Sequence, residues 1–334
     1  MKPLNVVVFG AGEWGKNYLR LLQSHPQVGR VRVVETDARR RQWLQTQFAG
    51  VELVSDPEQG WSAEFPCVVI ALPARLHFEY LRRAISQRKH ILVEKPAVLD
   101  MQEGQQIDRL LDGYGQILMV GHVFLYNPGI ARLKELICDG ALASVYFLKM
   151  TRTNLGPIRS DVNCLFDLAP HDISIMLHLL DKLPQQVSAI GSAFLNGRHA
   201  DVAFANFQFS DGIVASIHVS WLAPRKTREL TLVAQDRMAV FDDVAPVEKL
   251  RIYDKGVRPD YRDYGEFQMI IQDGDVHIPR LPPIEPLKQQ VDAFLESVVT
   301  GAPPLTDWRH GLDVVRVLCA ADESLRADGA PIRI

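Results

Sequence analysis

The feature that most constrains the fold is a strand-like run that ends in three spaced glycines. Residues 4–10 read LNVVVFG, and Gly10, Gly12 and Gly15 form a GxGxxG pattern. A continuous β-branched run is typical of a strand buried on both faces of a parallel sheet. The glycines permit a tight turn, a close approach of the backbone to a pyrophosphate, and packing of the next helix. The pattern therefore predicts a dinucleotide-binding turn.

An acidic residue about 20 residues after such a turn commonly accepts the hydroxyls of the adenosine ribose. Asp37 stands there, at the end of a second strand-like run, and favours NAD. The adjacent residues 39–41 are all arginine. They could hold a 2′-phosphate and admit NADP, or form the solvated first turn of a helix, and we favour the helix.

Strand and helix patterns alternate from residue 4 to about residue 121, which predicts a doubly wound parallel sheet. Residues 1–121 are therefore expected to form the dinucleotide-binding domain, and residues 122–334 a second domain that binds substrate. In that second part strands follow one another, with apolar and polar residues alternating over 213–221. This period of two predicts a mostly antiparallel sheet with one buried face. Residues 255–286 are rich in proline, glycine and aspartate and are expected to be irregular.

Composition excludes several classes of function. The net charge of −3 gives no basic footprint for nucleic acid. No apolar run reaches the roughly 18 residues of a membrane span, and no secretory signal is recognised. The four cysteines and ten histidines lack metal-ligand spacing, and Cys164 has no activating base nearby in the sequence. We expect a reduced, cytoplasmic protein without a metal site.

Two short stretches carry candidate chemistry. VEKPA, residues 93–97, follows a strand, so Lys95 is expected at the carboxyl edge of the sheet, where ligands bind. LFDLAPHDIS, residues 165–174, places Asp167 and His171 one helical turn apart. His171 could accept the proton of a hydroxyl while hydride leaves its carbon, because histidine titrates near neutrality. The alternatives are a solvated lysine, a buried histidine, and an Asp167 that caps the helix with Pro170 in its first turn.

Together these motifs resemble the glucose-fructose oxidoreductase, inositol dehydrogenase and rhizopine-catabolism (Gfo/Idh/MocA) family. The resemblance rests on GAGEWG, on ALPARLHFEYLRRAISQRKHILVEKP, on DLAPHDI and on the C-terminal AFLESVVTGAPPLTDWRHGLDVVRVL. It implies a Rossmann domain followed by an α/β domain whose open sheet often joins subunits, here into a homodimer or homotetramer. It also implies that Lys95 and His171 act at the substrate with help from Asp167. The residues expected at the cofactor are Gly10, Gly12, Glu13, Trp14, Gly15, Asp37, Leu72, Pro73, His77, Glu94 and Lys95.

The family acts mainly on sugars, polyols and nucleotide sugars, so the resemblance implies a sugar or nucleotide-sugar substrate. Residues Arg152, Asn154, Arg159 and Asn163 precede the second motif, and the arginines could grip a diphosphate or carboxylate. They could equally stabilise a domain interface. Two rival functions remain open. One is a non-catalytic dinucleotide-binding sensor or partner protein, and the other is a reductase of keto-sugars that uses the same residues.

Overall fold

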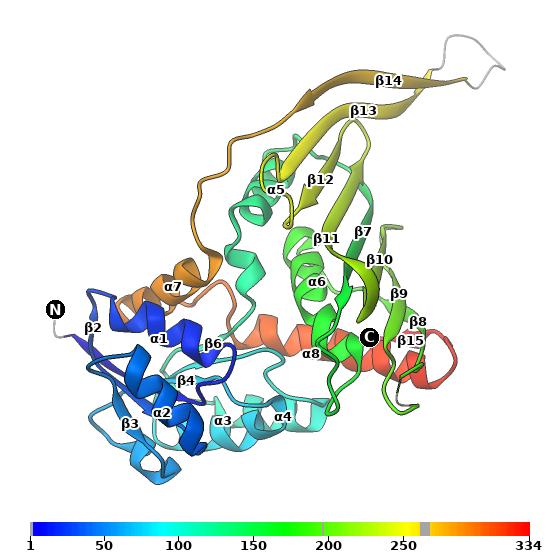
Figure 1. Ribbon diagram of the computed structural model, residues 1–334. Helices are drawn as coiled ribbons and strands as arrows, with labels where there is room; N and C mark the ends of the chain where they lie inside the picture. The colour runs from blue at the N-terminus through cyan, green and yellow to red at the C-terminus, as the bar shows by residue number, and fades with distance from the viewer. Residues whose placement is uncertain (1–2, 196, 261–267) are drawn as a thin grey trace. The chain divides into compact units, whose positions relative to one another are not determined.

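The computed structural model describes residues 3–195, 197–260 and 268–334, which divide into two units (Figure 1). The first unit contains Met1–Tyr126 together with Glu285–Val315, and the second contains Asn127–Ile284 with Arg316–Ile334. A single division after residue 121 therefore differs from the structure. A segment near the end of the chain returns to the first unit because its apolar side chains Val291, Phe294 and Leu295 are buried in that unit's core.

The first unit is built on six parallel strands in the order β3-β2-β1-β4-β5-β6, the doubly wound arrangement that the sequence predicts. The strands are β1 (Leu4–Phe9), β2 (Val28–Val34), β3 (Glu52–Val54), β4 (Cys67–Ile70), β5 (His90–Val93) and β6 (Leu118–Val120). The α-helices are α1 (Gly15–Gln23), α2 (Ala38–Gln47), α3 (His77–Ser86), α4 (Met101–Leu110) and α7 (Pro286–Thr300). Short 3-10 turns are η1 (Pro57–Trp61), η2 (Ala74–Leu76) and η3 (Val123–Tyr126).

Successive residues of β1 face opposite sides of this sheet. Val6 and Val8 belong to the core that also contains residues of α1 and α7, whereas Phe9 contacts the rings of Trp61 and Tyr80 on the other side. Both sides of β1 are thus covered, which explains why LNVVVF is apolar without alternation.

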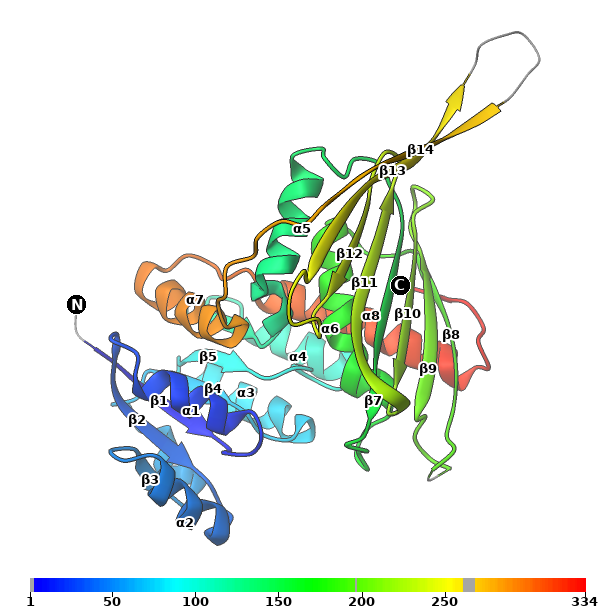
Figure 2. The same ribbon diagram turned by 45° about the horizontal axis from the view of Figure 1, so that its top comes forward.

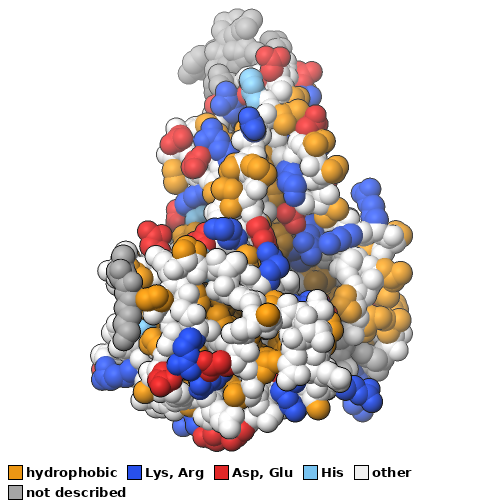
Figure 3. All heavy atoms as spheres, turned by 60° about the vertical axis from the view of Figure 1, so that its left-hand side comes forward, with side chains coloured by type: hydrophobic (Ala, Val, Ile, Leu, Met, Phe, Trp, Pro, Cys, Tyr) orange, Lys and Arg blue, Asp and Glu red, His pale blue; other side chains and the backbone are white. Residues whose placement is uncertain are grey.

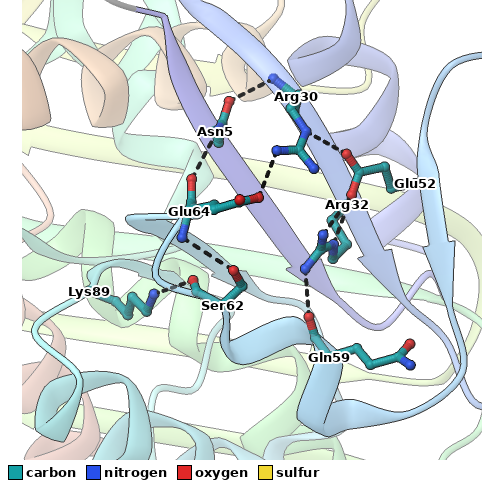
Figure 4. Close-up of polar contacts among 8 residues, drawn as sticks. All are labelled: Asn5, Arg30, Arg32, Glu52, Gln59, Ser62, Glu64 and Lys89. Carbon is teal, nitrogen blue, oxygen red and sulfur yellow. Dashed lines mark hydrogen bonds and ion pairs between the residues drawn. The ribbon is translucent and has the colours of Figure 1, made fainter.

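A polar cluster fastens the β2–β3 side of the sheet (Figure 4). Arg30 and Arg32 of β2 both bind the carboxylate of Glu52 on β3, with nitrogen–oxygen distances of 2.6 and 2.8 Å. The Lys89 ammonium donates to the carbonyl oxygen of Ser62 at 2.7 Å. The Arg32 guanidinium also donates to the Gln59 carbonyl oxygen at 2.7 Å, which ties β2 to η1. The arginines of RVRVV therefore hold neighbouring segments while its valines are buried in the core.

The second unit is built on nine strands in the order β14-β13-β12-β11-β7-β10-β9-β8-β15, all antiparallel neighbours except β7 and β10. The strands are β7 (Val145–Leu155), β8 (Gln186–Ser192), β9 (Val202–Gln208), β10 (Val214–Ser220), β11 (Leu222–Ala234), β12 (Met238–Asp242), β13 (Leu250–Asp260), β14 (Gln268–His277) and β15 (Ile332–Arg333). The helices are α5 (Pro128–Cys138), α6 (Cys164–Leu180) and α8 (Trp308–Arg326), and α8 begins in the first unit. Helix α6 packs on β10, β7 and β9 (Figure 2).

The expectation of an irregular segment at 255–286 is wrong for its described residues up to 277. β13 and β14 form a long hairpin at one edge of the sheet, and residues 261–267 lie outside the described part (Figure 1). Gly256 and Gly274 allow close backbone approach there, because a Cβ would lie 2.4 Å from the Gln235 carbonyl oxygen and 2.8 Å from that of Asp254. Charged side chains of both signs lie among apolar ones next to the undescribed residues (Figure 3). Lys255 of β13 and Asp273 of β14 form an ion pair at 2.8 Å.

We expect Gly129→Ala to destabilise the second unit by about 1–3 kcal/mol, because the new Cβ would lie 2.3 Å from the buried ring of Phe241. Urea unfolding followed by circular dichroism measures the change. In a Phe241→Leu background the same Gly129→Ala substitution should cost less, since the smaller side chain leaves room. An equal cost in both backgrounds would refute the steric explanation.

Candidate active site

The glycine turn lies between β1 and α1 as the sequence predicts. Gly10 has a φ of +87°, and a Cβ on Gly15 would lie 2.0 Å from the Gly10 carbonyl oxygen. Packing within the chain therefore explains Gly10 and Gly15. It does not explain Gly12, where a Cβ would meet nothing within 4 Å.

The space beside Gly12 suits a pyrophosphate at the start of α1. No side chain caps this helix, and its first turn contains no acidic residue. Backbone N–H groups at a helix start attract an anion. Glu13 and Trp14 lie on the turn, and Glu13 is exposed and paired with Lys16. The residues present therefore fit the pyrophosphate of NAD.

The acidic residue beside this turn is Glu35, which the sequence analysis did not select. Its carboxylate accepts hydrogen bonds from the backbone N–H groups of Ala11 at 3.0 Å and of Asp37 at 2.9 Å. Asp37 instead caps α2, accepting from the Arg40 N–H at 2.8 Å, a bond that holds the pKa of Asp37 below its usual value. Its position directly after the last residue of β2 is the sequence feature that could have identified Glu35 as a candidate.

Arg40 and Arg41 are not purely solvent-exposed, because both contact the residues at the end of β2. Arg40 forms an ion pair with Glu35 at 3.1 Å. Arg41 donates to the backbone carbonyl oxygens of Glu35 and Thr36. Arg39–Arg41 do form the first turn of α2, as favoured from the sequence.

The loops after β4 and β5 are joined by His77. Its two ring nitrogens lie 2.8 Å from the Pro96 carbonyl oxygen and 2.9 Å from that of Leu72. His77 is buried, and Leu72 and Pro73 lie in the loop after β4. The contact explains a histidine in this place: it holds together two loops at the carboxyl edge of the sheet.

A buried hydrogen-bond chain holds the segment that contains Lys95. Gln290 of α7 donates to the Tyr18 hydroxyl at 2.8 Å, and Tyr18 donates to the Glu94 carboxylate at 2.6 Å. The Lys95 backbone N–H donates to the same carboxylate at 3.2 Å. Burial raises the pKa of Glu94, while the Tyr18 hydrogen bond and the Lys95 charge oppose that rise. Lys95 itself is half-buried beyond the end of β5.

A second buried histidine, His122, lies near Lys95 and was also missed. It follows the carboxyl end of β6, and its ring stands edge-on to that of His310 with centroids 5.4 Å apart. Burial, His310 and the positive charge of Lys95 hold the pKa of His122 well below its usual value, so the ring is neutral at pH 7. Nothing in its sequence context distinguished His122 from an ordinary residue at the end of a strand.

In the second unit, α6 begins at Cys164 and presents both Asp167 and His171. Asn163 is the N-cap, accepting from the Phe166 N–H at 2.9 Å, so the alternative of an Asp167 cap is wrong. Pro170 consequently lies inside the helix. Asp167 accepts from the Trp221 indole at 3.1 Å and pairs with Arg159 at 3.3 Å. His171 follows one turn later and is buried.

The next residue of α6, Asp172, forms a buried ion pair with Arg152 of β7. Two guanidinium nitrogens of Arg152 lie 2.8 and 2.9 Å from the two carboxylate oxygens, and both side chains are 6% exposed. Bidentate pairing of this kind fixes orientation as well as distance. It anchors the turn of α6 that carries His171 to the central strand of the sheet.

The four residues predicted to bind substrate make contacts within the unit. Arg159 binds both oxygens of Asp161 in addition to Asp167. Asn154 donates to the Gly156 carbonyl oxygen, and Asn163 donates to Asp322 at 2.7 Å. Their role toward a substrate stays a prediction.

Other chemistry finds little support among the described residues. No group of three or more His, Cys, Asp or Glu side chains there could hold a metal ion. Burial raises the pKa of Cys164 to about 12, so the thiol is protonated at neutral pH.

Within the described chain, no helix combines the length and apolar character needed to cross a membrane.

Two family models match the chain. The model described as "Oxidoreductase family, NAD-binding Rossmann fold" matches residues 4–122, and the GFO/IDH/MocA C-terminal domain matches residues 130–241. The chain belongs to the GFO/IDH/MocA oxidoreductase family. The resemblance seen in the sequence is confirmed, and so is the pairing of a Rossmann sheet with a mostly antiparallel one. As a family member the chain is an NAD(P)-dependent oxidoreductase that acts on CH–OH groups.

Three similar proteins illustrate the family. The UDP-N-acetylglucosamine 3-dehydrogenase of Acidithiobacillus ferrooxidans is 27% identical over 261 residues, covering 78% of this chain and 77% of the relative. A putative oxidoreductase from Magnetospirillum magnetotacticum MS-1 is 29% identical, with a TM-score of 0.82 over 96% of this chain and 99% of that one. GenD2 from gentamicin A biosynthesis, solved with NAD, is 23% identical, with a TM-score of 0.84 over 100% and 97% of the chains.

We expect Asp172→Ala to destabilise the second unit by about 3–5 kcal/mol, because it leaves the Arg152 guanidinium buried without its carboxylate. Urea unfolding again provides the measurement. The double variant Arg152→Met/Asp172→Leu, which removes both charges, should lose less stability than Asp172→Ala alone. A larger loss in the double variant would mean that shape, not charge pairing, holds this contact.

Proposed function

We propose that the protein oxidises a hydroxyl group of a sugar or nucleotide sugar, with Lys95 and His171 acting on the same substrate. His171 accepts the hydroxyl proton as the carbon loses hydride, and the C–O bond becomes a carbonyl. Lys95 orients the hydroxyl by hydrogen bonding and stabilises developing negative charge on its oxygen. NAD, when bound, supplies the acceptor for the hydride. The same residues serve the reverse reduction of a keto-sugar.

The observation that supports this proposal most directly is the way Lys95 is held. The Gln290–Tyr18–Glu94 hydrogen-bond chain fixes the segment that carries Lys95 at the carboxyl edge of the parallel sheet. The glycine turn after β1 lies at the same edge. Ligands of doubly wound sheets bind along that edge. Because this buried chain of hydrogen bonds ends on the Lys95 backbone, it restricts where the Lys95 side chain can reach, which favours a positioning role over a solvated lysine.

Asp167 supports His171 in this proposal. The Trp221 indole and the Arg159 guanidinium fix its carboxylate one helical turn before the histidine. This fixed carboxylate assists His171 when the histidine accepts the hydroxyl proton.

The names of the relatives indicate the class of substrate. One is a dehydrogenase of UDP-N-acetylglucosamine, and others are inositol 2-dehydrogenases, so their substrates carry ring hydroxyls. We infer that this chain also oxidises a ring hydroxyl of a carbohydrate. A sensor that only binds the dinucleotide would not need Lys95 to be held in this way.

We further propose that copies of the chain associate through the outer face of the nine-stranded sheet. Helix α6 covers the inner face, whereas the outer face exposes Phe147, Ile190, Phe204 and Val214 on neighbouring strands. The Phe204 ring stacks on His218 with centroids 4.3 Å apart. Exposed apolar side chains on neighbouring strands, with polar ones such as Ser216 between them, suit a symmetric contact between identical subunits.

We expect Lys95→Ala and His171→Ala each to lower turnover at least about 100-fold, because each removes a group that acts at the hydroxyl. NADH formation with a panel of sugars, polyols and UDP-sugars measures turnover, and calorimetry should show that NAD still binds. His178→Gln, which alters another histidine of α6, is the matched control and should retain activity. Unchanged turnover in the Lys95 and His171 variants would exclude these roles.

We expect Glu35, rather than Asp37, to decide the preference between NAD and NADP. Its carboxylate lies beside the Ala11 N–H of the glycine turn, where a 2′-phosphate would meet negative charge. Glu35→Ser should weaken NAD binding and narrow the NAD/NADP affinity ratio by about 10-fold or more. Asp37→Ala should change mainly the stability of α2, because it removes a helix cap. The opposite pattern would return the ribose-binding role to Asp37.

A further inference from the structure

The basic residues of β7, of the segment before α6 and of β11 fall into two groups. Arg152 and Arg159 are held by the carboxylates of Asp172 and of Asp161 and Asp167. Arg228 of β11 likewise pairs with Asp243 at 3.2 Å. These cations already have anionic partners within the unit, so an anionic substrate group would have to compete for them.

The second group consists of Arg225 and Lys226, at the start of β11. Both are exposed, and among the described residues neither makes an ion pair or a side-chain hydrogen bond. Two adjacent positive charges without a carboxylate partner contrast with the paired arginines around them. Their charge is therefore available to a ligand.

The backbone places this pair in a bulge. Leu222 pairs with Leu155 of β7, and Thr227 pairs with Thr153, so residues 223–226 stand opposite Asn154 alone. Extra residues in one strand bend it and redirect its side chains, and such bulges are frequent beside active sites. The bulge interrupts the ladder just where the two basic residues occur.

The bulge begins close to the proposed catalytic helix. Trp221 directly precedes β11, is fully buried, and donates its indole N–H to Asp167, one turn before His171. The Trp221 carbonyl oxygen also accepts from the Gly156 N–H at 3.0 Å. Arg225 lies four positions after Trp221, which in extended chain is a span of at most about 13 Å between their Cα atoms. Both long side chains can approach a group attached to a sugar held near Asp167.

We propose that Arg225 and Lys226 bind the diphosphate of a nucleotide-linked sugar whose ring hydroxyl is oxidised at His171. An arginine can donate two parallel hydrogen bonds to a phosphate, and an adjacent lysine adds a point charge. The inference rests on the proposed dehydrogenase function and names its substrate class. It assigns diphosphate recognition to the bulge of β11 rather than to Arg152 and Arg159.

Calorimetric titration of UDP into the NAD-loaded full chain tests this inference without requiring turnover. Arg225→Ala/Lys226→Ala should weaken UDP binding about 10- to 100-fold, because charge-assisted hydrogen bonds are lost. Arg280→Ala/Arg333→Ala removes the same charge from exposed positions of the second unit and should bind UDP within about 2-fold of the unchanged protein. Uridine, which lacks phosphate, should bind the three proteins alike.

Equal UDP affinity in the Arg225/Lys226 variant and the unchanged protein would overturn the inference. An equal loss in the Arg280/Arg333 variant would also overturn it, since the effect would then be one of net charge. Failure of the unchanged protein to bind UDP would do the same. None of these results bears on hydride transfer from uncharged sugars, which decides the dehydrogenase function separately. Because both residues are exposed, the thermal midpoint of the variant should match that of the unchanged protein.

Discussion

The parallel direction of the six strands in the first unit is the constraint on which its chemistry depends. Parallel strands all end at one edge, so the residues that follow β1, β2, β4 and β5 are brought together although they are far apart in the chain. That edge therefore contains the glycine turn, Glu35, Leu72 and Lys95. Short-range bonds then fix each segment: His77 joins the loops after β4 and β5, and Glu94 joins the Lys95 segment to α1. The sheet sets the position, and buried polar contacts set the orientation.

The second unit positions its histidine differently. α6 is tied to the sheet by a buried ion pair, Arg152–Asp172, and Asp167 is tied to Trp221. Replacing a buried ion pair by an apolar contact of similar volume often costs little stability. A bidentate pair, however, fixes the rotation of the helix about its axis, and His171 is the neighbouring residue. We interpret the pair as a positioning device for the turn that carries the proposed acid–base group.

The sequence predicted the elements and their order well because hydrophobic period reports burial directly. The continuous run of β1 and the alternation in β10 each indicated the correct environment. Motif spacing also led to the loops that hold Gly12 and Lys95. Prediction of the irregular region failed because glycine and aspartate usually mark loops, whereas here close backbone packing in an edge hairpin accommodates them.

Other features depend on contacts that spacing does not contain. Asp37 and Glu35 are both acidic and two residues apart, and only the helix cap shows that Asp37 is occupied. Asn163 replaced Asp167 as the N-cap because α6 begins one turn earlier than the motif suggested. The return of α7 to the first unit depends on packing across nearly the whole length of the chain. The role of the residues predicted to bind substrate depends on the chemistry of the substrate, which residue spacing does not contain.

The most direct test of the central claim follows the hydrogen that leaves the sugar. The substrate is UDP-N-acetylglucosamine, or another sugar that the protein oxidises, with deuterium on the carbon that carries the reacting hydroxyl. It is incubated with the protein and NAD, and the NADH that forms is examined by proton NMR. The account predicts deuterium at C4 of the reduced nicotinamide, transferred without exchange with water. Deuterium released into water, with none on the nicotinamide, would contradict hydride transfer and with it the proposed dehydrogenase.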